Sequence, residues 1–483
     1  MGWSGGVTEG GVAPEPAAGR VSRWPRWARA VSLGVAGRVA GLFVVMCAIS
    51  APLLAYQIHR NPGVSPIDEP SYLDYVQKVH RGHFIVGNGE PLDAATRREI
   101  ACRGIPPVVP PDPVACRNPP TTPAGRNSAD IDPPTYYVLT DVGARVLLGL
   151  RVTRNLTTAA RLVGIAWAGA ALTVLYLLAG LLGASRLSAG IVSVAVLATG
   201  GVHTFWTHVT PHAADLLVGG LAVTAVLLWD RRRLGGWVLP LCGALPVLVK
   251  ASNATVVAAV LLFLLAGALW PAGRPVARAA PDPDPDQPGD PDQPGDPDQP
   301  GPGEPAGGGS PDRRRYAVGA SLVFAGLLAG SVLWLVVRRH YALTTSNEFP
   351  RFNVTSFQWH WLGDELGAFA QPYRAGAGIL LTLWLNGTVI RYLTASTGGG
   401  ALQRLSLAAL VTSVLGAWLY VFSNYLLIHQ HTRIPGRYGL TLVPLVAALG
   451  AANLGPRTAR TVAALYTGVL VVVAVRAGMP PQG

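Results

Sequence analysis

The sequence is poor in charged residues. Only 13% of its 483 residues are Asp, Glu, Lys or Arg, about half of the ~25% that soluble domains carry. This scarcity excludes a water-soluble globular enzyme, and it excludes a largely disordered chain, because disorder accompanies high charge and few apolar residues. Residues of the set AVILMFWYC make up 50% of the chain. Since a span needs roughly 20 apolar residues, we expect an all-α, multi-pass integral membrane protein.

Lysine is almost absent: Lys78 and Lys250 are the only two, so arginine carries nearly all of the positive charge behind the net charge of +12. In a soluble protein such a balance would suggest nucleic acid. Here the arginines cluster at the ends of apolar runs, where they set the topology. We therefore expect membrane lipid, and no nucleic acid, as a partner.

Cysteine is also scarce, with four residues in the chain. Cys47 and Cys242 lie in apolar runs, whereas Cys102 and Cys116 share one polar loop. If this loop faces an oxidising compartment, these two are expected to form a disulfide. None of the cysteine pairs has the spacing of metal ligands.

The first span is preceded by five arginines between Arg20 and Arg38. We interpret it as an uncleaved span of the cell membrane over about 39–56, with the N-terminus in the cytoplasm. The polar stretch from His59 to about Asp132 then lies outside. Further apolar runs bring the expected number of spans to about eleven, and they lie at about 160–183, 187–206, 213–229, 235–250, 252–270, 316–337, 375–391, 404–428, 437–453 and 458–476.

The segment 133–150 is ambiguous, and parity favours an interfacial helix. If it crossed the membrane, the arginines of 231–233 would fall outside, against the positive-inside rule. If it lies in the interface, these arginines and those of 271–315 fall inside, and the C-terminus is outside.

The expected organisation has four parts. Three consecutive copies of DPDQPG fill 284–301, and Pro and Gly without apolar residues are typical of a disordered linker. The parts are a cytoplasmic tail (1–37), an N-terminal transmembrane module (38–270) with an outer loop (58–132) and interfacial helix (133–150), a cytoplasmic linker (271–315) and a C-terminal transmembrane module (316–483).

Adjacent carboxylates follow the first span at Asp68 and Glu69, before Pro70 and Tyr72. Carboxylates beside a membrane are costly unless they are solvated, paired or used in function. They could mark a solvated loop start with Glu69 capping a short helix. Alternatively, Asp68 is a general base that takes a proton from an acceptor hydroxyl.

Two further motifs precede apolar segments. Asp132-Pro133-Pro134-Thr135-Tyr136-Tyr137 could be an interfacial anchor. Arg433-Ile434-Pro435-Gly436-Arg437-Tyr438 opens a late span, where arginines oppose the helix dipole. The unfavourable interaction with the dipole is offset if the two arginines bind a phosphate. The alternative is that the arginine side chains extend to lipid headgroups.

In their order, these motifs resemble the GT-C superfamily of integral-membrane glycosyltransferases, which use polyprenyl-phosphate sugars. Protein mannosyltransferases, aminoarabinose transferases and the DUF2142-like group belong to it. The resemblance covers the layout of the N-terminal two thirds, and each motif is short. It implies an α-helical bundle with interfacial helices in the first outer loop.

The resemblance places the family's catalytic acid on Asp68, with Glu69 beside it, and the Pro-Pro-aromatic element on 133–137. The late phosphate-binding arginine would be Arg437, near Arg433, and the earlier one Arg154 or Arg161. The expected substrate cavity comprises Tyr72, Pro134, Tyr136, Tyr137, His212, Asp215 and Tyr438. Two features depart from the family: Pro211-His212-Ala213-Ala214-Asp215 leaves the role of Asp215 open, and the DPDQPG insert is no part of the pattern.

Histidines gather near the same loops: His203, His208 and His212 around one span end, and His360, His429 and His431 in later loops. Neutral imidazoles are common metal ligands, yet no HExxH arrangement is present, and polar residues at a cavity mouth explain them equally well. We expect no cofactor, with a divalent metal as the alternative.

The interpretation is an inverting transfer of a sugar from a polyprenyl-phosphate donor to a cell-envelope glycan or glycolipid on the outer face. The alternative is a transporter or flippase for a lipid-linked or small polar solute. A transporter favours charges inside spans and broken helices in paired halves, whereas the polar residues here concentrate on one side.

Overall fold

The computed structural model describes residues 26–66, 68–118, 125–270, 311–343, 356, 358, 387–394, 400–428 and 436–476. Its contacts divide the chain into one unit from Met1 to Leu42 and another from Phe43 to Gly483. The described part of the first unit is the beginning of α1 (Arg26–Arg60). All contacts below belong to the second unit. In the described ranges every regular element is a helix, as the composition predicts.

Six helical segments are long and apolar enough to cross a membrane: Gly34–Arg60, Leu156–Leu181, Pro211–Asp230, Ala251–Leu269, Arg313–His340 and Arg457–Arg476. They belong to α1, α6 (Leu156–Leu181), α9 (Asp215–Asp230), α11 (Ala254–Leu269), α12 (Pro311–His340) and α17 (Arg457–Arg476). A seventh arises if α7 (Arg186–Ala198) and α8 (Gly200–Thr207), which meet at a bend of 70°, form one span. These helices confirm the predicted class of helical membrane protein.

The number of eleven spans stays a prediction. The 12 residues of α10 (Val238–Val249) extend only ~18 Å, less than the ~30 Å hydrocarbon core. The helix α16 (Val443–Asn453) follows a 3₁₀ turn, η6 (Gly436–Leu442), and α15 spans Ala401–Ile428. Most of the run 375–391 lies outside the described residues, as does the linker stretch 271–310; α12 begins at Pro311, inside the predicted linker.

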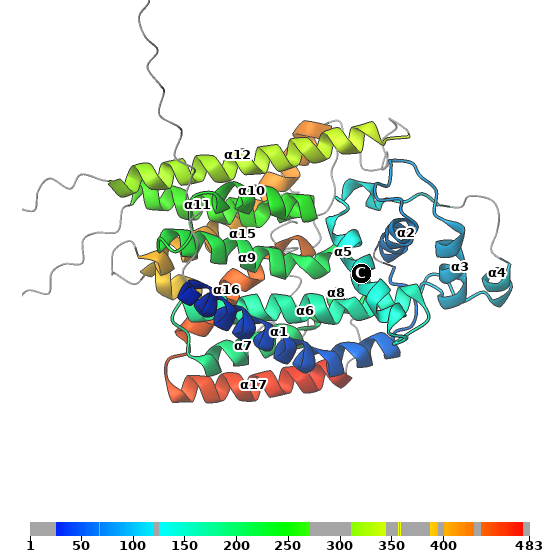
Figure 1. Cartoon of the computed structure of the whole chain (residues 1–483), viewed down its shortest axis with the longest axis horizontal. Coiled ribbons are helices and arrows are strands. Elements are labelled where there is room, and N and C mark those ends of the chain that lie inside the picture. Colours follow the sequence, from blue (N-terminus) through cyan, green and yellow to red (C-terminus); the bar gives the residue numbers. More distant parts are fainter. Residues whose placement is uncertain are drawn as a thin grey trace, which may run out of the picture. The chain divides into compact units, whose positions relative to one another are not determined.

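The long helices of the second unit pack through small residues. Figure 1 shows α10, α11 and α12 side by side, and α6 close to α9. A Cβ on Gly243 of α10 would overlap the Val323 carbonyl of α12, and one on Gly326 of α12 would overlap the Pro240 carbonyl of α10. Because neither residue has a side chain, the two backbones can approach closely, as is common in membrane helix pairs.

Four short helices and a 3₁₀ turn gather at one end of this unit (Figure 1), which we call the α2–α5 end: α2 (Glu69–His80), α3 (Ala94–Arg103), α4 (Pro113–Arg117), η1 (Ala129–Ile131) and α5 (Thr135–Gly149). The predicted disulfide is confirmed, since Cys102 and Cys116 are bonded and join α3 to α4. Arg103 donates hydrogen bonds to the side chains of Asn155 and Thr158, which ties α3 to the start of α6.

The helix α5 does not carry the chain to the opposite end. At its start, the Thr135 hydroxyl donates to the Leu248 carbonyl near the end of α10 (2.7 Å). After its end, the Asn155 side chain caps α6 by accepting from the Thr158 amide (2.8 Å). The end of α10 and the start of α6 both lie at the α2–α5 end, so α5 starts and finishes there.

Candidate functional site

The α2–α5 end collects most of the buried charged side chains that the structure describes. They come from α2, the 130–132 segment, the start of α6, the 208–215 loop and the end of α10: Glu69, Asp74, Lys78, Asp130, Asp132, Arg161, His208, His212, Asp215 and Lys250. Charges inside apolar surroundings are retained when they are paired or functional. This end is therefore the candidate site.

Asp68 precedes α2 in an unusual backbone conformation. Its φ of 56° and ψ of −3° lie in the left-handed region, which L-residues adopt rarely and which Asp and Asn tolerate best. The Asp68 carbonyl accepts from the amides of Ser71 (3.0 Å) and Tyr72 (3.1 Å), so the conformation is held by the first turn of α2. The residue is partly exposed.

Glu69, the next residue, is by contrast wholly buried and paired with Arg161. Glu69 Oε2 lies 2.8 Å from Arg161 Nη2, and Oε1 lies 2.9 Å from Arg161 Nε. The amides of Ser65 (2.6 Å) and Val209 (3.0 Å) also donate to this carboxylate. Burial would raise the pKa of Glu69, but the charge of Arg161, the nearby His208 and the hydrogen bonds from Arg161 and the Ser65 amide outweigh burial and lower it.

Arg161 has its remaining donors occupied as well. Its Nη1 donates to the Asn61 carbonyl (3.0 Å) and its Nη2 to the Gly63 carbonyl (2.6 Å). The guanidinium is about 1% exposed. In this arrangement Arg161 joins α6 to the segment after α1 and to α2. Its donors are occupied by protein groups, and a phosphate-binding role for Arg161 stays a prediction.

A second buried pair joins Asp132 to Lys250. Lys250 Nζ lies 3.0 Å from both carboxylate oxygens of Asp132 and 5.6 Å from the centre of the Tyr72 ring. The Tyr137 hydroxyl donates to Asp132 at 3.4 Å. Burial, together with the Asp132 charge, raises the pKa of Tyr137, so this phenol stays protonated and can donate.

Three expected cavity residues form an aromatic layer next to this pair. The rings of Tyr72 and Tyr137 are 6.3 Å apart, and those of Tyr136 and Tyr137 meet edge to face at 5.3 Å. Tyr75, which sequence reasoning missed, stacks on Tyr137 at 4.0 Å. The Tyr136 hydroxyl accepts from the Thr210 amide (3.1 Å), and this bond links the layer to the loop whose Val209 amide binds Glu69.

The two lysines carried a signal that sequence reasoning did not use. Like Lys250, Lys78 is buried, with Nζ 2.9 Å from Asp74 and 3.0 Å from Glu90. In a chain that uses arginine elsewhere, each lysine is a buried cation paired with a carboxylate, Lys78 with Asp74 and Glu90 and Lys250 with Asp132. Both lysines of this lysine-poor sequence therefore occupy buried, paired positions at the α2–α5 end.

His212 and Asp215 also come together at the start of α9. His212 Nδ1 lies 2.6 Å from Asp215 Oδ2, and both side chains are about 1% exposed. Asp215 is the first residue of α9, where a carboxylate interacts favourably with the helix dipole. The His212 ring packs 5.4 Å from Phe205.

The remaining expected residues are placed less completely. Pro134 is the residue before α5, and Arg154 is exposed in the loop between α5 and α6. Arg433 lies outside the described residues, and of Arg437 and Tyr438 only the backbone is described, in η6. This turn packs on α9: a Cβ on Gly219 would overlap the Thr441 carbonyl.

A polar cavity of about 230 Å³ lies beside the end of α2, and sequence reasoning did not identify it. Its lining residues are Lys78, Arg81, His83, Glu90, Pro91 and Asp93. His83 Nε2 lies 3.2 Å from Glu90. Burial would raise the pKa of Glu90, but the Gly87 amide and Lys78 lower it overall. The lowered pKa favours the ionised form of this carboxylate beside the Lys78 cation.

Among the described residues no three His, Cys, Asp or Glu side chains are grouped as metal ligands. His203, His208 and His212 are each buried. His360, His429 and His431 fall outside the described residues.

Comparisons of the chain with family models, curated proteins and solved structures find no match.

Proposed function

We propose that the chain is a membrane glycosyltransferase that moves a sugar from a polyprenyl-phosphate donor to an acceptor hydroxyl. The observation that carries the proposal is the division of roles at Asp68 and Glu69. Glu69 is locked by Arg161 and two backbone amides, and Asp68, partly exposed, is held in a left-handed conformation on that frame. Catalytic groups need such rigid support to keep productive geometry, and backbone strain concentrates at functional positions.

In the proposed reaction the Asp68 carboxylate accepts the proton of the acceptor hydroxyl. The hydroxyl oxygen bonds to the anomeric carbon while the bond from that carbon to the phosphate oxygen breaks. The polyprenyl phosphate leaves with the electron pair, and the configuration inverts. Arg437, Arg433 and the exposed Arg154 are the proposed partners of the developing phosphate charge.

The proposed topology places the N-terminus in the cytoplasm and the α2–α5 end outside. It is supported by α5, which starts and ends at the α2–α5 end and so fits an interfacial helix. It is also supported by the disulfide, because such bonds persist in oxidising compartments. The acceptor would be a cell-envelope glycan or glycolipid.

The test is transfer by the purified full chain in nanodiscs, with Asp68→Asn and Asp68→Gly variants. Asn tolerates the left-handed conformation and Gly relaxes it, so both remove the carboxylate and spare the backbone. We expect turnover to fall by roughly 100-fold or more in both, with unchanged thermal stability and donor binding. Wild-type turnover in either folded variant would refute Asp68 as the base.

A transporter is the second candidate, favoured by the 70° break between α7 and α8. Broken helices and buried charges line substrate pathways in transporters. Against it, the pairs Glu69–Arg161, Asp132–Lys250 and His212–Asp215 all lie at one end. Sealed vesicles that accumulate the solute or flip the lipid without sugar transfer would decide for this alternative.

A further inference from the structure

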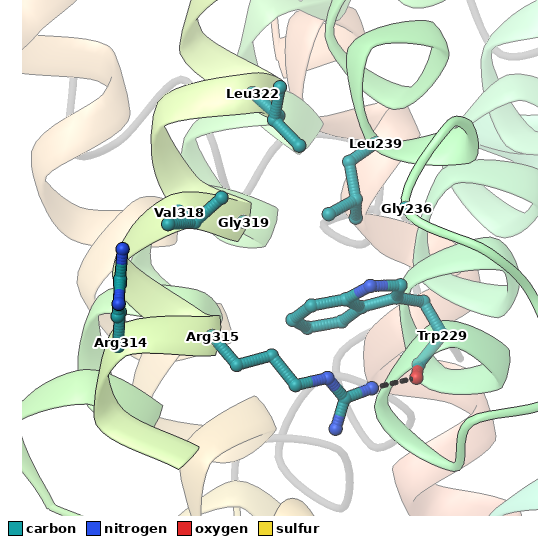
Figure 2. A pocket seen from close by; sticks show the side chains of 8 residues that line it. All are labelled: Trp229, Gly236, Leu239, Arg314, Arg315, Val318, Gly319 and Leu322. Atoms are coloured by element: carbon teal, nitrogen blue, oxygen red, sulfur yellow. Dashed lines mark hydrogen bonds between the residues drawn. The ribbon is translucent and has the colours of Figure 1, made fainter. Parts of the chain in front are cut away.

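A second cavity lies at the opposite end of the bundle, where α9 ends and α12 begins. It has a volume of about 370 Å³ and is lined by Trp229, Gly236, Leu239, Arg314, Arg315, Val318, Gly319 and Leu322. Figure 2 shows the Trp229 indole on one side and Val318 and Leu322 of α12 on the other; Arg315 reaches across toward Trp229, and Arg314 lies farther out on the α12 side. None of these residues belongs to the site around Asp68.

The two arginines differ in their contacts. The guanidinium of Arg315 stacks over the Trp229 ring at 4.2 Å and donates to the Trp229 and Asp230 carbonyls. Arg314 is exposed and makes no hydrogen bond or ion pair within the described part of the chain. Beside an apolar cavity, Arg314 is thus a cation available to an outside anion.

The cavity lies where the hydrocarbon core of a membrane would end. Trp229 stands one residue before the end of the candidate span Pro211–Asp230, and Val318 and Leu322 lie early in the candidate span Arg313–His340. Tryptophan is enriched at this depth, where headgroups meet acyl chains. An occupant must therefore be apolar over most of the cavity and anionic at the edge.

We propose that this cavity binds an anionic phospholipid, with an acyl chain against Trp229, Leu239 and Leu322 and the phosphate at Arg314. The volume falls within the range of about 300–1,000 Å³ for ligand pockets, and basic pockets between membrane helices recognise anionic headgroups. The lipid would cover the exposed apolar side of α12 and link it to the α9–α10 turn. The site is independent of the transferase proposal.

The chain offers a matched pair of charge variants. Arg313→Gln removes a cation one residue away that is exposed and does not line the cavity, whereas Arg314→Gln removes the proposed phosphate partner. The cavity can be filled separately by Gly236→Leu, because a Cβ at Gly236 has no atom within 4 Å and meets open space. This variant keeps both arginines.

The experiment titrates the purified full chain with phosphatidylglycerol, phosphatidylcholine or glycerol 3-phosphate and counts bound lipid by native mass spectrometry. We expect phosphatidylglycerol to bind more tightly than phosphatidylcholine. Its affinity should fall about fivefold in Arg314→Gln, the effect of one surface cation on an anionic lipid, and should persist in Arg313→Gln. In Gly236→Leu it should fall at least as much.

Four outcomes would overturn the proposal. Equal affinities for phosphatidylglycerol and phosphatidylcholine would show that binding does not depend on a net negative charge of the lipid. Equal losses in Arg313→Gln and Arg314→Gln would indicate a diffuse surface potential rather than a site. Full affinity in folded Gly236→Leu, or glycerol 3-phosphate binding as tightly as phosphatidylglycerol, would show that the acyl chain does not occupy the cavity.

Discussion

Glu69 and Arg161, 92 positions apart in the sequence, form a two-bond ion pair that is closed to solvent. The pair connects α2 and α6, and through the Val209 amide it also holds the loop between α8 and α9. Removing one member of a buried pair leaves an uncompensated charge, which costs about 3–5 kcal/mol. Asp68 is the residue directly before Glu69, at the start of α2.

The first prediction is a double-mutant cycle on this pair. Glu69→Gln and Arg161→Met should each lower the free energy of unfolding by about 3–5 kcal/mol, seen as a lower melting temperature in detergent. The double variant should lose less than the sum of the two, because no unpaired charge remains. Additive losses would show that the residues act separately.

The pH dependence of stability follows from the lowered pKa of Glu69. A carboxyl whose native pKa lies below its ordinary value of 4.5 stabilises the fold above that pH, and this contribution is lost as pH falls through the native pKa. The difference in free energy of unfolding between wild type and Glu69→Gln should therefore be constant from pH 7 to about 5 and decrease below ~4.5. Thermal unfolding over this range measures it. A gap that widens with acid would contradict the assignment.

The disulfide prediction concerns Cys102 and Cys116. Alkylation of the denatured, unreduced protein should label Cys47 and Cys242 alone, and reduction should expose the other pair. Closing a loop with a sequence separation of 14 stabilises by about 3 kcal/mol in the chain-entropy model, so Cys102→Ser with Cys116→Ser should lower the melting temperature. Cys47→Ser is the control that leaves the bond intact.

Gly219 should not tolerate a side chain. A Cβ there would overlap the Thr441 carbonyl of η6, so Gly219→Ala must push η6 away from α9, and we expect a loss of about 1–3 kcal/mol from overpacking. Gly180 of α6 has no atom within 4 Å of a Cβ, and Gly180→Ala should be neutral or stabilising by about 0.5–1 kcal/mol. Equal melting temperatures for the two variants would exclude the close contact.

Lys250 should be needed for the fold of the aromatic layer. Lys250→Met leaves Asp132 buried without its cation, at a cost of about 3–5 kcal/mol, and Asp132→Asn in the same chain should restore part of it. Arg339→Met is a suitable control, because Arg339 is exposed at the end of α12 and surface changes alter stability by about 0.5 kcal/mol or less. The melting temperatures of all three variants test this prediction.

What the sequence by itself determined is local. Apolar runs of span length predicted helices in a membrane, because the bilayer imposes both length and composition. Two cysteines 14 positions apart in one polar loop predicted their bond, given an oxidising compartment, since chain connectivity already held them close. The number of spans was harder to predict, because an apolar window does not reveal that the run 187–206 bends between α7 and α8 or that only 12 residues of the run 235–250 form α10.

The tertiary structure alone decided which charges meet. Lys250 binds Asp132 across 118 positions and Arg161 binds Glu69 across 92, distances at which the sequence carries no information on pairing. Both Asp68 and Glu69 were candidate catalytic residues by pattern. Folding separated them, because a helix start turns successive side chains in different directions: Glu69 points into the protein, where burial requires a cation, and Asp68 remains partly exposed.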